Sequence, residues 1–296
     1  MKPALTFEQQ LDLLVERGMI LDVSRDFALS FLAENNYYRL SGYFKLFCKS
    51  GCDEFVEGFS FNALRKLYIF DFDLRRVLND LLEEVEVIVK TQIAYHLSLN
   101  ISPDFYLNGL YFHNLSHFNN FSTKVHDEIT KNRTSPIVMR YANETMPIWA
   151  LVELLSLGTI SKMFSNLKTA YRKMVSDTGK YYEYNNNAFA TYLYVTVQLR
   201  NKCAHRGRLY ARYINANISF SQEDLNLLNG FSYPYNASSS QCTVFMAIYA
   251  AFKLINDKAV KQSYIDKIQH LFVQYNDVVN PNLLGFFDNW DEVLIG

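Results

Sequence analysis

The segment RNKCAHRGR, residues 200–208, carries the side chains with the clearest potential for chemistry in this chain. Residues 185–222 include no Asp or Glu, but they include the basic residues Arg200, Lys202, Arg206, Arg208 and Arg212. The net charge of the whole chain is −1, so this cluster is a local feature. Like charges held together repel one another unless an anion lies among them. We therefore expect the segment to bind phosphate; the alternative is a surface patch that faces the acidic residues 83–86.

Three residues of this segment, Arg200, Asn201 and His205, have the spacing of a shared site. The sequence predicts a helix over residues 188–206 that Gly207 ends, which puts His205 in the last turn. Asn201 precedes His205 by four residues and so lies on the same helix face. Arg200 precedes His205 by five residues, which corresponds to about 7.5 Å along the helix axis and about 140° around it. A long arginine side chain can span this separation. The helix dipole favours a protonated His205 and the neighbouring cations favour a neutral one, so we expect this side chain to exchange a proton near neutral pH.

These residue types suit the cleavage of RNA by attack of its own 2′-hydroxyl group. The substrate supplies the nucleophile, and the protein has only to move protons and to stabilise a more negative phosphorane. We expect His205 to transfer protons, Arg200 to bind phosphate oxygens with its planar guanidinium, and Asn201 to orient the site. The other basic residues are expected to follow the RNA backbone: Lys202, Arg206, Arg208 and Arg212.

Aromatic side chains beside basic ones leave a second function open. Tyr37 and Tyr38 precede Arg39, and Tyr210 follows the basic segment. Such rings can stack on unpaired bases. A protein that holds a structured small non-coding RNA without cutting it would use the same residues. Core packing or the anchoring of a turn is the simpler role for these tyrosines.

The sequence predicts no metal site and no cofactor. Cys48 and Cys52 are separated by three residues rather than two, and no second Cys/His pair has zinc-ribbon spacing. His113 and His117 are one helical turn apart but have no third ligand nearby. The acidic residues 83, 84 and 86 are expected to form a solvated helix face rather than a catalytic cluster.

Scarce helix breakers and long apolar repeats predict an all-α fold. The chain of 296 residues contains 11 Gly and 6 Pro, and 49% of it is hydrophobic. The strongest pattern predicts a helix over residues 61–99. Further helices are expected over the first residues up to Gly18, which Thr6 and Gln9 cap, and over residues 25–35, 148–167, 188–206, 243–256 and 263–279. Residues 35–43 are expected to form a turn, and residues 100–145 to be irregular.

The helices are expected to share one continuous core. Candidates for this core in the helix over residues 148–167, where Pro147 suits the first turn, are Trp149, Leu151, Leu154, Leu155 and Ile160. We expect a small helical appendage over residues 1–59 and a helical domain over residues 60–296. The first residues lack the apolar stretch of a signal peptide, and the longest apolar run, residues 244–252, is far short of the ~20 residues of a membrane span. A cytoplasmic protein without a membrane partner is expected.

The motif Arg200-Asn201-x3-His205 resembles the Arg-x4–6-His motif of the HEPN ribonuclease superfamily. The chain as a whole resembles the Abi-like family of bacterial abortive-infection proteins. The stretches that carry this resemblance are NNYYRLSGY (35–43), FDFDLRRVLNDLLEEVEVIVKTQIAYHLSL (70–99), PIWALVELLSLGTISKMFSNL (147–167) and RNKCAHRGRLY (200–210). Leu157 and Ala211 depart from the family pattern, away from the motif.

The resemblance implies an HEPN-type helical bundle and metal-independent RNA cleavage. It implies that Arg200 and His205 are the catalytic pair and that Asn201 supports them. It also implies a homodimer, in which two Arg/His pairs meet in one cleft. The role implied is defence against phage through growth arrest, as in toxin-like systems, and some relatives work with a small non-coding RNA.

Overall fold

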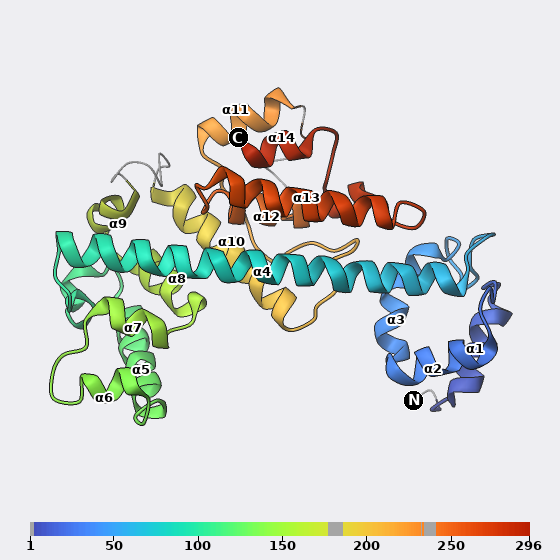
Figure 1. The fold of residues 1–296 in the computed structure, drawn as a ribbon, viewed down its shortest axis with the longest axis horizontal. Helices are drawn as coiled ribbons and strands as arrows, with labels where there is room; N and C mark the ends of the chain where they lie inside the picture. Colours follow the sequence, from blue (N-terminus) through green and yellow to red (C-terminus); the bar gives the residue numbers. More distant parts are fainter. Residues whose placement is uncertain (1–2, 177–185, 232, 234–240) are drawn as a thin grey trace.

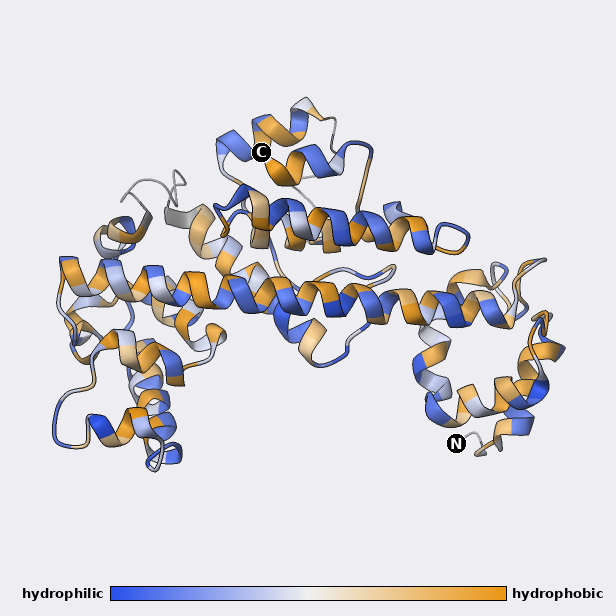
Figure 2. Ribbon diagram, viewed as in Figure 1, coloured by the Kyte–Doolittle hydropathy of each residue, from blue (hydrophilic) through white to orange (hydrophobic). Residues whose placement is uncertain are grey.

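The fold is organised around one long helix, α4, Phe61–Asn100 (Figure 1). The computed structural model describes residues 3–176, 186–231, 233 and 241–296. α4 has 40 residues and therefore extends about 60 Å. It begins at Ser60, whose hydroxyl accepts a hydrogen bond from the Ala63 amide, and it runs unbroken because no Gly or Pro occurs in it. Its buried stripe recurs every three or four residues, so apolar and polar side chains alternate along its whole length (Figure 2).

The other helices form three groups along α4 (Figure 1). At its amino end lie α1 (Phe7–Glu16), α2 (Arg25–Glu34), α3 (Tyr37–Phe44) and the short η1 (Lys45–Phe47). At its carboxyl end lie η2 (Phe105–Leu107), η3 (Gly109–Tyr111), α5 (Leu115–Lys131), α6 (Pro136–Arg140), α7 (Ile148–Leu154), α8 (Leu157–Asn166) and α9 (Thr169–Ser176). Around its middle lie α10 (Asn186–Ala204), α11 (Gln222–Gly230), α12 (Val244–Phe252), α13 (Lys258–Gln274), η4 (Pro281–Leu284) and α14 (Trp290–Ile295). The described ranges hold helices and isolated β-bridges but no strand, which confirms the all-α fold.

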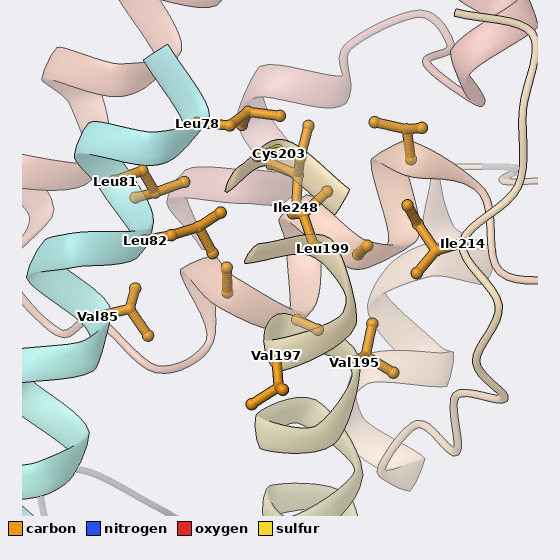
Figure 3. Packing of buried hydrophobic residues seen from close by; sticks show 14 of the residues in the cluster. Leu78, Leu81, Leu82, Val85, Val195, Val197, Leu199, Cys203, Ile214 and Ile248 are labelled. Atoms are coloured by element: carbon orange, nitrogen blue, oxygen red, sulfur yellow. The ribbon is translucent and has the colours of Figure 1, made fainter. Parts of the chain in front are cut away.

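The core holds α10 between α4 and α12. Leu78, Leu81, Leu82 and Val85 of α4 are buried and point toward α10 in Figure 3. All nine residues of α12 are buried, so this helix is apolar on every side, as expected for the centre of a bundle. The position of α10 is therefore set by packing on both of its neighbours. This packing fixes the helix that ends at the basic segment.

Two regions are more regular than the sequence suggested. The prediction of a turn over residues 35–43 is wrong, because most of these residues belong to the helix α3. Asn36 caps α3, and the helix buries Leu40, Tyr43 and Phe44. The irregular region expected over residues 100–145 is also wrong in part, because α5 occupies 17 of its residues. α5 buries only Phe121 and Val125, and so narrow an apolar stripe gives a weak periodic signal.

The single helix expected over residues 148–167 is two helices, α7 and α8. The break falls at Leu155 and Ser156, where the Ser156 hydroxyl accepts a hydrogen bond from the Thr159 amide and caps α8. Pro147 precedes α7 rather than standing inside its first turn. Of the expected core residues, Leu151, Leu155 and Ile160 are buried, whereas Trp149 is 51% exposed.

The helices expected over residues 243–256 and 263–279 are present as α12 and α13, but α12 ends four residues earlier and α13 lies five residues earlier than expected, whereas the amino-terminal caps are as expected. The capping box of α1 is present, with the Thr6 amide donating to Gln9 Oε1 at 2.9 Å, and Ser24 caps α2 as expected. Residues 1–59 contain α1 to α3, and α3 packs on α4; the division from residues 60–296 stays a prediction. Across the part of the chain that the structure describes, every helix is too short or too polar to cross a membrane.

Candidate functional site

The carboxyl end of α10 brings the predicted catalytic residues to the surface. α10 packs on α4, α8 and α12, so only one side of it faces solvent. Tyr194, Gln198, Asn201 and His205 recur at steps of four and three residues and follow this side. His205 is exposed, and its amide donates to the Asn201 carbonyl at 3.0 Å, which continues the helical pattern. Asn201 and His205 therefore share one face, as the sequence predicts.

The helix ends at Ala204, two residues earlier than expected, in a tight left-handed turn. The Gly207 amide donates to the Lys202 carbonyl at 2.7 Å, and the Arg206 amide donates to the Cys203 carbonyl at 3.0 Å, which is the Schellman pattern. The left-handed residue is Arg206, with φ of 55°, and not Gly207. Gly207 is required for a different reason: a Cβ there would lie 2.8 Å from Lys202 Cγ and 3.1 Å from the Lys202 carbonyl oxygen.

Replacing Gly207 with alanine should destabilise the protein by about 1–3 kcal/mol, because the new methyl group overpacks the turn against Lys202. Denaturant unfolding followed by far-UV circular dichroism measures this change. Gly230→Ala is the matched control, since a Cβ at Gly230 has no described atom within 4 Å. Equal stability of the two variants would show that the turn adapts without cost.

The loop that follows His205 is anchored by a buried carboxylate, Asp71 of α4. Its oxygens accept hydrogen bonds from the amides of Leu209 at 3.0 Å and Tyr210 at 2.7 Å, and from the Tyr43 hydroxyl at 2.7 Å. Arg75 pairs with Asp71 one turn along α4 and also donates to the Gly207 carbonyl at 3.3 Å. Burial and Asp71 raise the pKa of Tyr43, so its hydroxyl remains a donor. α3, α4 and the loop are thus joined at one point.

Arg200 is held by a carboxylate that the sequence placed on a solvated helix face. Glu86 of α4 lies 3.6 Å from Arg200 and 2.7 Å from Lys90, and its side chain is largely buried between them. The expectation of a solvated acidic face is therefore wrong for Glu86, whereas Glu83 and Glu84 are exposed as expected. The Arg200 side chain remains 43% exposed, and its contact with Glu86 is long, so it can still meet an anion.

Arg200 and Asn201 line a pocket of about 230 Å³ between α5, α8 and α10. The structure thus brings these two residues to one cavity. His205 is not among the residues that line it and stands exposed one turn farther on. The cavity walls also carry Lys124 and Lys162, which the sequence analysis did not select.

Of the other basic residues, two are exposed and two are half-buried and contact other parts of the protein. Arg206 and Arg212 are exposed. Lys202 is half-buried and donates to the Tyr213 carbonyl at 2.7 Å; burial and the nearby Arg212 lower its pKa. Arg208 is half-buried, with its guanidinium carbon 5.5 Å from the ring centre of Tyr43. Lys202 and Arg208 therefore help to hold the loop in place, and their expected contact with an RNA backbone stays a prediction.

The tyrosines differ strongly in exposure. Tyr210 is 1% exposed, and its hydroxyl accepts a hydrogen bond from the Asn280 amide, so this ring packs in the core, the simpler role, and the alternative of stacking on a base is wrong for it. Tyr37 is half-buried and packs its ring edge against Phe44. Tyr38 is 86% exposed. Arg39 donates to the Arg206 carbonyl and so ties α3 to the turn after α10.

Sequence reasoning missed Asp71, although a signal for it exists. Asp71 falls on the buried stripe of α4, between Leu67 and Leu74 at steps of four and three. An acid at such a position must have partners, and Arg75 follows four residues later. Lys124 and Lys162 have no such signal, because they meet only through the packing of α5, α8 and α10. Over the described ranges, no three His, Cys, Asp or Glu side chains lie close enough together to hold a metal ion.

The fold and the site define an all-α protein in which a long central helix supports a basic helix end at the surface. A family model described as Abi-like protein matches residues 30–211, more than half of the chain, including α3, α4 and α10. The chain therefore belongs to the Abi-like protein family. Comparison with curated proteins gave no match, and comparison with solved structures gave none either.

Proposed function

We propose that this protein is a metal-independent HEPN endoribonuclease of a bacterial phage-defence or toxin-like system. Its family suggests a part in abortive infection, a defence against phage. Its chemistry would reside in Arg200, Asn201 and His205. Cleavage would proceed through attack of the 2′-oxygen on the adjacent phosphorus, with the P–O5′ bond breaking.

The observation that carries the proposal is the surface position of the α10 end. His205 is exposed there, and Arg200 is half-exposed while Glu86 limits its movement. Asn201 shares the face of His205 and the pocket of Arg200. We propose that a phosphodiester bound at this surface meets both the imidazole and the guanidinium.

The reaction needs one group to accept the 2′-hydroxyl proton and one to give a proton to the departing 5′-oxygen. A single His205 can do either, and two copies can do both at once when their α10 ends face each other. We therefore propose a homodimer with a composite site. Arg200 would stabilise the phosphorane charge in either arrangement.

A second function, RNA binding without cleavage, is favoured by the surface of α3. Tyr38 exposes nearly its whole ring, and the adjacent Arg39 contacts the turn after α10. An unpaired base could stack on Tyr38 while the RNA backbone passes Arg206 and Arg212. Such a protein would hold a small non-coding RNA in a ribonucleoprotein.

Cleavage of single-stranded RNA in EDTA tests the proposal. The wild-type protein should cut the RNA and leave 2′,3′-cyclic phosphate ends, because the 2′-oxygen is the nucleophile. An RNA with 2′-deoxy nucleotides at the cut positions should stay intact. A requirement for Mg²⁺, or cleavage of the deoxy substrate, would contradict this mechanism. Co-purification of one discrete, stoichiometric RNA without turnover would support the second function.

A further inference from the structure

The pocket beside Arg200 is lined by cations from three different helices. Lys124 comes from α5, Lys162 from α8 and Arg200 from α10. No Asp or Glu is among its lining residues, all of which lie in the described part of the chain. Lys124 and Lys162 are exposed, so they can change rotamer toward a ligand. Glu86, which is not among the lining residues, lies 3.6 Å from Arg200, so the two lysines supply most of the positive charge that favours an anion as the occupant.

The first turn of α8 adds to the positive potential of the pocket. Ser156, Gly158 and Thr159 line the cavity together with Lys162. Backbone amides at a helix start carry the positive end of the helix dipole, and Gly158 has no side chain to cover them. The lysines, Arg200 and the start of α8 therefore all favour a negatively charged group in this pocket.

The opposite wall offers a surface for a base. Tyr194 lines the pocket and is 43% exposed, and Gln198 and Asn201 follow it on the same face of α10 toward His205. Their amide groups can both donate and accept hydrogen bonds. A volume of about 230 Å³ suits about one nucleotide rather than a folded RNA element.

We infer that this pocket binds the RNA nucleotide next to the scissile bond, with its phosphate between Lys124, Lys162 and the first turn of α8 and its base against Tyr194. This inference rests on the proposed function and adds the direction in which the RNA strand crosses the surface. From the scissile bond at the end of α10, the strand runs toward α8 and α5. It does not depend on Lys202 or Arg208, which are engaged within the protein.

Binding of a short single-stranded 2′-O-methyl RNA, which cannot be cleaved, tests the path. Lys124→Gln combined with Lys162→Gln should weaken binding at least tenfold. It should also lower the slope of log K against log salt by about 0.7, the value for one lost phosphate contact on a single strand. Lys258→Gln combined with Lys267→Gln on α13 removes the same charge elsewhere and should leave binding nearly unchanged.

Two tyrosine variants test the base contact separately. Tyr194→Leu should weaken binding about tenfold, whereas Tyr213→Leu, at an exposed position outside the pocket, should not. Far-UV circular dichroism should show that all variants fold, since these side chains are partly or wholly exposed. Equally tight binding of a free nucleoside monophosphate would overturn the assignment to an RNA strand.

The failure of this inference is distinguishable from the failure of the proposed function. If the double lysine variant binds the 2′-O-methyl RNA as the wild type does, the pocket is wrong, while cleavage by the wild type still supports the nuclease. If the wild type never cuts RNA but the lysine variant binds it more weakly, the pocket is right and the nuclease is wrong.

Discussion

Replacing His205 with alanine should lower the rate of RNA cleavage by about 10²- to 10⁴-fold, the usual contribution of a positioned acid–base group. Histidine is the side chain that most often acts as a general acid or base, and His205 is the only histidine at the described α10 end. Arginine remains charged there and cannot replace it. Single-turnover cleavage with saturating protein measures the change in the chemical step and excludes effects on product release.

The His205 variant offers a clear separation between chemistry and folding. His205 is exposed and lies beyond the last residue of α10, so its removal should change stability by less than about 0.5 kcal/mol. His126→Ala, at an exposed position on α5, is the matched control and should keep full activity. Cleavage that survives in the His205 variant would remove the basis of the proposed mechanism.

The same variant tests whether the site is composite. A heterodimer of wild-type and His205→Ala chains, purified through two different tags, has one His205 imidazole instead of two. If two facing copies form one site, this heterodimer should lose nearly all activity. If each copy acts alone, it should keep half. A monomer in sedimentation experiments would exclude the composite site.

Helix type and approximate position were predictable because they depend on local patterns. The α4 stripe recurs over forty residues, and the side chains of Thr6, Ser24 and Ser60 each accept a hydrogen bond from a backbone amide in the first turn of their helix. α7 and α8 were merged because their apolar pattern continues across the break. Ser156 separates them, because its side chain accepts a hydrogen bond from the Thr159 amide and so starts a new helix where the first one could have continued.

The site was predictable only in part, since its decisive contacts join distant segments. The surface position of His205 and its shared face with Asn201 follow from helix geometry. The pairing of Arg200 with Glu86 spans more than a hundred residues and depends on how α10 crosses α4. The burial of Tyr210 likewise depends on Asn280, which no local pattern connects with it.

Asp71 links the fold to the site, because one carboxylate holds both the loop after His205 and the helix α3. It is fully buried and meets Arg75, the Tyr43 hydroxyl and two backbone amides. A buried carboxylate is stable only when its charge and lone pairs are satisfied in this way. The direction of the chain as it leaves α10 is thus set by contacts with α4.

Replacing Asp71 with asparagine should destabilise the protein by about 3–5 kcal/mol, because Arg75 is left as an uncompensated buried charge. The amide also turns a donor toward one of the groups that now donate to Asp71, namely Tyr43 and the amides of Leu209 and Tyr210. Urea unfolding should show a lower midpoint with an unchanged slope. Hydrogen exchange at the Leu209 and Tyr210 amides should accelerate in the folded variant, since both lose their charged acceptor.

Asp80→Asn is the matched control on the same helix, where the aspartate is exposed, and should change stability by no more than about 0.5 kcal/mol. In the Asp71 variant, RNA cleavage should fall even at temperatures where the protein remains folded, because the turn at Arg206 and Gly207 loses its anchor beyond the helix end. Full activity together with rapid exchange at Leu209 would show that the loop position does not matter for the chemistry. It would then confine Asp71 to a purely structural role in joining α3 to α4.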